Sequence, residues 1–316
     1  MDLIPYALAY FGLAVFAVAV IARVAMWSKL PMHLRWELYP VAHEAKKAVY
    51  GGSYLEESEW WNKPRESSIL GELKVMLAEI IFLVAVKEHN PSLWTRTFPF
   101  HFGLYLVITC TALLMGVSVL GLFAPGLLQG ALGSLVQIVI VTLGAGGLTL
   151  GLIGALGLLH RRLTHPDLKD YTSPADIFNL VFFIAAFGCS LCSFLLVDRN
   201  FAQVSAFIGN LVAFNPAPLA GSGLETMLPA ISVILMSLLV AYIPLTHMSH
   251  FVAKYFAYHA IRWNDTPNLP GGPQEKAIGE LLTQPVTWGA DHINADGKKS
   301  WADVATEMPR EEGKKK

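Results

Sequence analysis

Long apolar runs separated by short polar stretches dominate this sequence. From Thr97 to Leu159 there is no Asp, Glu, Lys or Arg, although a helix needs only about 20 apolar residues to cross a bilayer. The interval therefore predicts two spanning helices, with a turn near FAPGLLQG at residues 123–130. Similar runs occupy residues 3–27, 174–197 and 227–251. The pattern predicts an all-α integral membrane bundle of five transmembrane helices. The first run is too long for a signal peptide and has no polar n-region with a cleavage site, so we expect a retained span.

A further apolar segment, residues 69–87, carries charges that argue against a sixth span. Each of Glu72, Lys74 and Glu79 would cost about 2.5–3.5 kcal/mol near the middle of a helix in lipid. Its apolar side chains recur at helical spacing, at Ile69, Leu73, Met76, Leu77, Ile80 and Val84. We therefore predict an amphipathic helix on the inner face of the membrane, lying in the interface or docked on a partner.

Composition agrees with this pattern, and charge adds an orientation. Hydrophobic residues make up 54% of the chain, charged residues 15%, and the mean hydropathy is +0.47, which is typical of a membrane protein. Lys and Arg number nine in residues 28–97, three in 160–173 and nine after the fifth helix, against none in 124–130 and one in 198–225. Because Lys and Arg gather in cytoplasmic loops, we predict the N-terminus outside and the C-terminus inside.

The ten histidines all fall on the predicted inner half. We interpret four of them as solvated loop residues, namely His33, His43, His89 and His292. His101 and His250 differ, because ionisable side chains inside a span are expensive and usually functional. Both have helix around them at similar depth, and a pair of neutral imidazoles from facing helices is how a b-type haem is held. We predict His101 and His250 as the axial iron ligands.

Other cofactor chemistries fit the sequence less well. Covalent haem attachment needs Cys-x-x-Cys-His, but Cys189 and Cys192 are followed by Ser193. We expect these two and Cys110 to be small buried apolar residues. A zinc site is disfavoured because no carboxylate or thiolate accompanies the histidines at that depth.

Several basic residues lie near the predicted haem. His247 is three residues before His250, about 60° away on a helical wheel, and is expected to face the haem edge or a propionate. His160, Arg161 and Arg162 end the third helix at the same depth. The arginines are topology anchors or propionate partners, and a second haem held by His160 and His247 is an alternative. His259, on the opposite side of the helix, is expected to be a surface residue.

Three motifs carry a family resemblance. The segment LLHRRLTHPDLKDYTSPADIFNLVFF, residues 158–183, resembles the loop between the third and fourth helices of the respiratory nitrate reductase gamma subunit. PFHFG and PLTHMSH resemble the haem-bearing second and fifth helices of that family, so the resemblance covers residues 98–255. The longer first loop is more similar to cytochromes b that serve heterodisulfide-reductase-like iron–sulfur subunits, including those of sulfate reducers. The resemblance implies haem b, exchange with menaquinone or another quinone, and a bacterial or archaeal cytoplasmic membrane.

The sequence departs from the family at the outer haem. The family pattern has a second histidine ten residues after the first in the second helix, and another eighteen residues before the last in the fifth. Those positions hold Thr111 and Ser232. Met115 and Met236 could offer thioethers, but core methionines are far commoner than ligand ones. We therefore predict a single haem b towards the inner face, with the quinone site in the inner leaflet or near mid-membrane and His247 and His160 as proton partners.

The predicted organisation requires a partner subunit that carries the iron–sulfur cluster. Residues 1–27 form the first helix, 28–97 an inner partner-binding loop with the interfacial helix, 98–256 the haem-binding core, and 257–316 a mostly extended inner tail. Neither inner segment contains Cys, so any iron–sulfur cluster must belong to another subunit. We expect a heterodisulfide-reductase-like iron–sulfur partner, further cytochrome c subunits and lipid contacts, but no nucleic acid. A haem-free membrane anchor is the alternative function; a transporter or channel is disfavoured because no carboxylate or Lys lies in mid-span.

Overall fold

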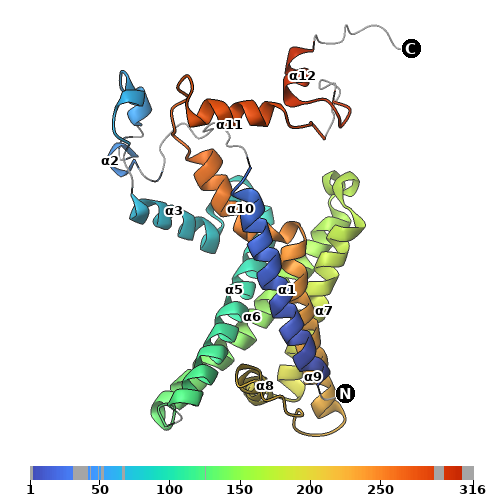
Figure 1. Ribbon diagram of the computed structural model, residues 1–316. Coiled ribbons are helices and arrows are strands. Elements are labelled where there is room, and N and C mark those ends of the chain that lie inside the picture. Colours follow the sequence, from blue (N-terminus) through green and yellow to red (C-terminus); the bar gives the residue numbers. More distant parts are fainter. Residues whose placement is uncertain are drawn as a thin grey trace, which may run out of the picture. The chain divides into compact units, whose positions relative to one another are not determined.

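The computed structural model describes residues 3–30, 42, 44–48, 50, 53–65, 68–124, 126–287 and 295–307. His33, His43 and His292 lie outside these residues, so their interpretation as loop residues stays a prediction. The chain divides into two compact units (Figure 1). The membrane unit comprises Met1–Ala19 and Val75–Met248, and the second unit comprises Val20–Lys74 and Ser249–Lys316.

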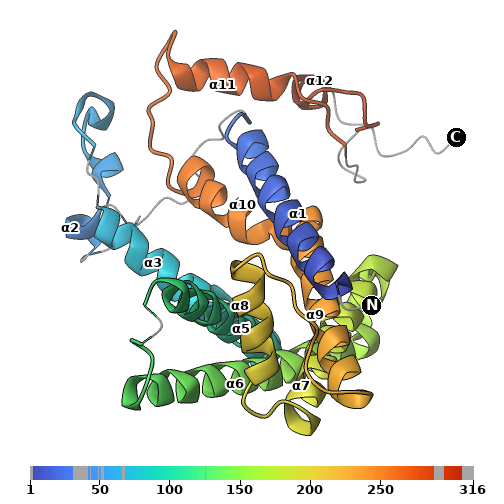
Figure 2. The same cartoon turned by 60° about the horizontal axis from the view of Figure 1, so that its bottom comes forward.

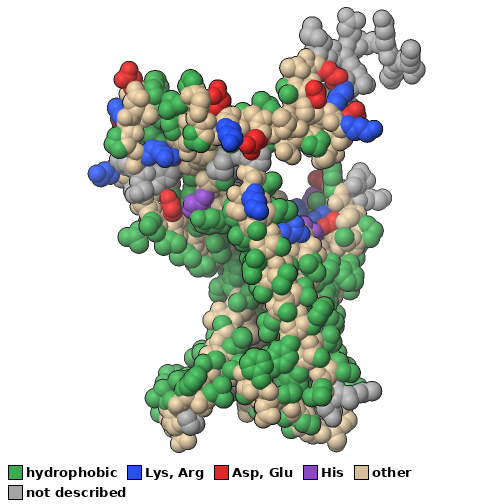
Figure 3. All heavy atoms as spheres, viewed as in Figure 1, with side chains coloured by type: hydrophobic (Ala, Val, Ile, Leu, Met, Phe, Trp, Pro, Cys, Tyr) green, Lys and Arg blue, Asp and Glu red, His purple; other side chains and the backbone are tan. Residues whose placement is uncertain are grey.

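The described residues contain five helical segments long and apolar enough to cross a membrane. They are α1 (Ile4–Trp27), α5 (Pro91–Phe123), α6 (Ala131–Thr164), α7 (Pro174–Leu196) and Leu224–Leu245, which joins α9 (Leu224–Tyr242) to the 3-10 turn η4 (Ile243–Leu245). No strand occurs in the described part, so the all-α class and the five spans are confirmed. The visible surface of the membrane unit is mainly hydrophobic along these helices (Figure 3). α5 starts seven residues earlier than predicted, because Asn90 caps it and Pro91 fits its first turn.

Helices α5 and α6 pack closely and antiparallel through glycines. An added Cβ at Gly103 would overlap the backbone nitrogen of Gly151, and one at Gly154 would overlap the backbone nitrogen of Phe100. Small residues let two helix backbones approach in this way in membranes. The seam fixes the depth of α5 against α6, and so the depth of the residues next to Phe100.

A short helix that the sequence analysis did not predict lies between the ends of the long ones. α8 (Ala202–Val212) lies between α5 and α9 in both views (Figures 1 and 2). Asp198 caps it: its carboxylate accepts hydrogen bonds from the backbone nitrogens of Ala202 (2.7 Å), Gln203 (2.8 Å) and Val204 (3.3 Å). The end of the membrane unit that carries this helix is called the α8 end below.

The fifth span ends earlier than its apolar run. α9 stops at Tyr242, η4 contains Pro244, and Thr246 is extended with φ −111° and ψ −176°. Proline has no backbone N–H to continue a helix. The 3-10 turn η5 (His247–Ser249), α10 (His250–Phe256) and the π-helix η6 (Ala257–Arg262) follow. The prediction of one helix over residues 227–251 is therefore wrong at its C-terminal end, and helical-wheel angles between His247, His250 and His259 do not apply.

The predicted amphipathic segment forms two helices rather than a span. α3 (Ile69–Phe82) and α4 (Val84–His89) meet at Leu83, which has a left-handed φ of 51°. The end of α3 is held by α5, since Tyr105 Oη donates to the carbonyl oxygen of Ile80 (2.9 Å) and Trp94 Nε1 to that of Phe82 (2.8 Å). Ile69, Leu70 and Leu77 are exposed. An apolar, exposed, non-spanning helix is what the sequence predicted; its place at the inner membrane face stays a prediction.

The second unit joins the first loop to the C-terminal tail. The loop contributes α2 (Ala45–Ala48), η1 (Tyr54–Glu56) and η2 (Trp60–Asn62). Tyr54 Oη donates to Asp265 Oδ2 (2.7 Å), Arg65 Nη1 lies 3.2 Å from Asp265 Oδ1, and His259 Nε2 lies 3.6 Å from Glu72 Oε2. These contacts tie the loop to the segment that follows the fifth span.

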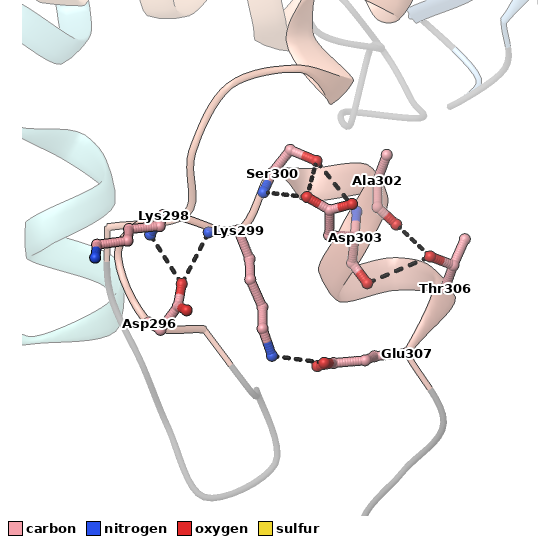
Figure 4. A network of polar contacts seen from close by, with 8 residues as sticks. All are labelled: Asp296, Lys298, Lys299, Ser300, Ala302, Asp303, Thr306 and Glu307. Carbon is pink, nitrogen blue, oxygen red and sulfur yellow. Dashed lines mark hydrogen bonds and ion pairs between the residues drawn. The ribbon is translucent and has the colours of Figure 1, made fainter.

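The described part of the tail is more structured than predicted. It contains α11 (Pro273–Leu282), α12 (Trp301–Thr306) and an antiparallel bridge between Pro285 and Ser300. Figure 4 shows Ser300 and Asp303 capping α12 reciprocally, and hydrogen bonds from Ser300 lower the pKa of Asp303. Backbone N–H groups of Lys299 and Lys298 likewise lower the pKa of Asp296. The tail therefore contains two short helices that the sequence analysis did not predict, and its mostly extended character stays a prediction.

Candidate functional site

His101 lies in the first third of α5 with its ring orientation fixed by its own helix. Its Nδ1 is 2.8 Å from the carbonyl oxygen of Thr97, one turn earlier. A carbonyl oxygen only accepts, so Nδ1 carries a proton, and Nε2 is the ring nitrogen that the predicted coordination would use. Metal-ligating histidines typically donate their other ring N–H to a backbone carbonyl in this way. The predicted ligand thus has the tautomer that iron coordination requires.

Packing holds the backbone at this position. The ring of Phe100, the preceding residue, meets Phe183 of α7 edge to face at 4.9 Å between centroids. Its backbone rests on Gly154 of α6. The imidazole of His101 itself lies edge to face with Phe100, at 5.3 Å between centroids. Three helices of the membrane unit therefore position this imidazole, as a rigid functional site requires.

His250, the other predicted ligand, begins α10 in the second unit, with Ser249 as the preceding cap residue. The structure describes His101 and His250 in different units, so their pairing across an iron atom stays a prediction. His259 is engaged elsewhere within the second unit. Its Nδ1 is 3.0 Å from the carbonyl oxygen of Tyr255, its ring stacks on Tyr255, and Nε2 faces Glu72. The sequence analysis expected a surface residue, and the structure shows a ring that these contacts partly bury.

The remaining predicted residues lie where α6 and α9 end and α7 begins. Arg162 Nη2 is 3.9 Å from Asp176 Oδ1, and His247 is near enough to the same carboxylate to attract it when protonated. His160 is exposed. Within the described residues, Arg161 Nε is buried and has no hydrogen-bond partner. A buried guanidinium nitrogen without a partner is costly, so this position is suited to an anionic group.

Sequence reasoning missed three polar residues close to this cluster. Asp176 also forms a capping box with Ser173 at the start of α7, a signal that Ser-x-x-Asp before an apolar run offers. One turn further, Asn179 is buried and accepts a hydrogen bond of 2.7 Å from Tyr242 Oη of α9. No spacing in the sequence marks that pair, because the two residues are 63 positions apart on different helices.

A cavity of about 220 Å³ lies further towards the α8 end of the membrane unit. It is lined by residues of α1, α5, α6, α7, α8 and α9. Thr111 and Ser232, the two positions at which the resemblance implies outer haem ligands, both line it. Thr111 Oγ1 donates to the carbonyl oxygen of Val107 (2.9 Å) and Ser232 Oγ to that of Leu228 (2.8 Å). The structure brings the two positions to one cavity, with hydroxyls that are already bonded to their own helices.

The cysteines are not uniformly buried as predicted. Cys110 is buried, Cys189 is partly buried, and Cys192 is exposed on α7. Cys192 lies four residues before the end of α7, one of the five candidate spans.

Five apolar spans, a fixed imidazole and a basic cluster at one end define a multi-pass membrane protein with the features of a redox subunit. Residues 88–264, more than half of the chain, match the nitrate reductase gamma subunit family. The chain belongs to this family. Its members are haem b-binding cytochromes that interact with quinone and serve as membrane subunits of larger complexes. No curated protein and no solved structure matches the chain significantly.

Proposed function

We propose that this protein is the cytochrome b subunit of a respiratory complex, carrying electrons between membrane quinone and an iron–sulfur subunit on the inner side. The observation that carries the proposal is His101, whose imidazole is set by Thr97 in the tautomer of a metal ligand on a span of a nitrate reductase gamma family member. A bound b-type haem supplies one-electron chemistry. His101 and His250 would hold the iron through imidazole nitrogens.

The basic residues at the same end of the membrane unit have supporting roles in this proposal. Arg161, with its buried unpaired Nε among the described residues, is the favoured partner for a haem propionate. Arg162 is engaged with Asp176 and holds that carboxylate near His247. Imidazole is the side chain best suited to proton transfer in proteins, so we assign His247, with the exposed His160, to proton exchange with quinone in the inner leaflet or near mid-membrane.

Two observations support the proposed iron–sulfur partner: the inner segments contain no Cys, and the second unit is folded. The sequence has no Cys in residues 28–97 or 257–316, so a cluster that receives or donates electrons there belongs to another polypeptide. We assign this place to an iron–sulfur subunit similar to heterodisulfide reductase, with cytochrome c subunits as further members of the complex. The loop tied to the tail by Tyr54, Arg65 and Asp265 offers a folded surface for it.

Optical spectroscopy of ligand variants tests the function. His101→Ala and His250→Ala should each abolish the low-spin b-type spectrum of the dithionite-reduced protein, because one axial imidazole is lost. His259→Ala is the matched control, since that ring is engaged with Glu72 and Tyr255. If both ligand variants kept the wild-type haem content and spin state, the ligand assignment would be wrong. A wild-type protein purified with its partner and free of haem would instead support the alternative of a haem-free anchor.

A further inference from the structure

The chain turns back on itself between α3 and α5 and runs along the start of α5. Lys87 of α4 lies over the ring of Trp94, 5.5 Å from its centroid, and Trp94 Nε1 donates to the carbonyl oxygen of Phe82. Earlier in the chain, the carbonyl oxygen of Ile80 accepts from Tyr105 Oη. Contacts that move back from α4 into α3 therefore move forward along α5. This is the geometry of a hairpin, and its central residues 75–86 are called the elbow below.

The contact with Tyr105 places the elbow beside the uncharged part of α5. Arg96 is the last charged residue before the run that has no Asp, Glu, Lys or Arg. Tyr105 follows it by nine residues, which is about 14 Å along an α-helix. Because α5 is one of the five candidate spans, the elbow lies against a part of the helix whose composition suits the interior of the bilayer.

The polar groups at the turn of the elbow are satisfied within the protein. Leu83 has a left-handed backbone with φ 51°, which separates α3 from α4. Carbonyl oxygens at the end of α3 accept from Trp94 and Tyr105, and Glu79 Oε2 accepts the backbone N–H of Ala85 (3.0 Å). Non-helical backbone at membrane depth is tolerated only where the protein satisfies its polar groups. The turn meets this requirement.

The side chains that the elbow exposes are apolar. Leu77 is 51% exposed, Phe82 53% and Val75 44%. Glu79 is the one ionisable residue in residues 75–86, and its side chain is partly buried and bonded to the first turn of α4. The carboxylate therefore faces the protein, whereas the surface that the elbow presents to its surroundings is hydrocarbon.

Charged residues begin at once on both sides of the elbow. Lys74 precedes it, Lys87, Glu88 and His89 follow it, and all four are exposed. A Lys side chain can lie along apolar surface and still keep its ammonium group in the headgroup region. Trp94, which packs against Lys87, belongs to a residue type enriched at that level. Twelve apolar residues are too few to cross a bilayer, so the chain enters and leaves on the same side.

We infer that the elbow is a re-entrant hairpin inserted among lipid acyl chains, in the leaflet at the opposite end of the membrane unit from α8, with the turn at Leu83 as its deepest point. Acyl chains cover Leu77 and Phe82, as they cover exposed side chains of the span that the elbow packs against, such as Ile108 (55%). A helix lying flat in the interface keeps one depth along its length, whereas this hairpin deepens towards its turn. The inference does not depend on haem or on the proposed function.

Spin labels along the hairpin test this depth profile. The full-length protein, without partner subunits, is placed in phosphatidylcholine nanodiscs, with single labelled cysteines in a background whose three native cysteines are replaced by alanine. Molecular oxygen concentrates in hydrocarbon, whereas a nickel chelate stays in water. The ratio of their collision rates with the label should rise from Leu70→Cys through Leu77→Cys to Phe82→Cys. Glu88→Cys, on the exposed charged flank, is the matched control and should give a low ratio.

The unsubstituted protein provides a second measurement. A diazirine dissolved in the bilayer forms a carbene on illumination, and it should label residues 75–86 to an extent comparable with the exposed side chains of α5, as mapped by mass spectrometry of peptides. A flat ratio along α3, a ratio at Phe82→Cys as low as at Glu88→Cys, or absence of carbene label from the elbow overturns the inference. Exclusion of both oxygen and the nickel chelate from Phe82→Cys also overturns it, because protein and not lipid then covers the elbow.

Discussion

At the scale of single residues, a buried hydrogen bond joins α7 to α9 beside the basic cluster. Tyr242 Oη donates to Asn179 Oδ1 at 2.7 Å, and Asn179 is only 6% exposed. Hydrogen bonds between membrane helices contribute on average about 0.6 kcal/mol and at most about 1.7 kcal/mol, but an amide left without its partner adds a desolvation cost. The pair therefore acts as a local clamp between the two helices.

Removal of this clamp gives a measurable loss of stability. Tyr242→Phe should lower the free energy of unfolding by about 1–2 kcal/mol, measured by denaturant titration in mixed micelles. Asn179→Leu in the Tyr242→Phe background should recover part of the loss, because no unpaired amide then remains. Strictly additive effects of the two substitutions would show that the hydrogen bond carries no coupling energy.

Single residues also show how far sequence reasoning reaches. His101 could be found because an imidazole inside an uncharged run of more than sixty residues is expensive. The contact of its Nδ1 with Thr97 follows from helical geometry once α5 is known to extend back to Pro91. Ser190, by contrast, is one hydroxyl among many in the sequence. Only the packing around it reveals a buried oxygen without a partner in the described residues.

At the scale of elements, the glycine seam between α5 and α6 controls the position of His101. An alanine at Gly154 must displace the backbone of Phe100, and overpacking of this kind costs about 1–3 kcal/mol. Gly154→Ala should therefore lower thermal stability and, through the shift next to His101, the haem content of the purified protein. Gly116→Ala is the matched control, since nothing lies within 4 Å of an added Cβ there; its stability should be unchanged or higher. Equal effects of the two substitutions would contradict a tight seam.

The helices that could be predicted from the sequence are those that hydropathy alone identifies. Five long apolar runs gave the five spans, and charges within residues 69–87 correctly excluded a sixth. The boundaries failed where a local backbone feature interrupts an apolar run, as Pro244 does after α9. α8 was missed because its eleven residues are too short for a span, although Asp198 and the spacing of Val204, Phe207 and Leu211 mark a capped helix. The pairing of the tail with the first loop depends on contacts between residues about 200 positions apart, such as Arg65 and Asp265, which no local pattern encodes.

At the scale of the whole molecule, the distribution of Lys and Arg predicts the orientation in the membrane. Ser58 of the first loop and Ser222 at the α8 end are both exposed. Ser58→Cys should react with a membrane-impermeant maleimide only after the cells are opened, and Ser222→Cys should react in intact spheroplasts. The unsubstituted protein measures the background from the native cysteines. The reverse labelling pattern would place the N-terminus inside.

The number of haems per chain depends on residues from several helices and is therefore a property of the whole molecule. The resemblance implies outer haem ligands at the positions of Thr111 and Ser232, which carry no imidazole, and both residues line the cavity of about 220 Å³. His101, His160, His165 and His247 lie at the opposite ends of α5, α6 and the fifth span from the α8 end. A pyridine haemochrome assay against protein concentration should therefore give one haem b per chain, and Thr111→Val should leave that value unchanged. A reproducible value of two would contradict the prediction. The haem content of His160→Ala and His247→Ala would then show whether these histidines hold the second iron.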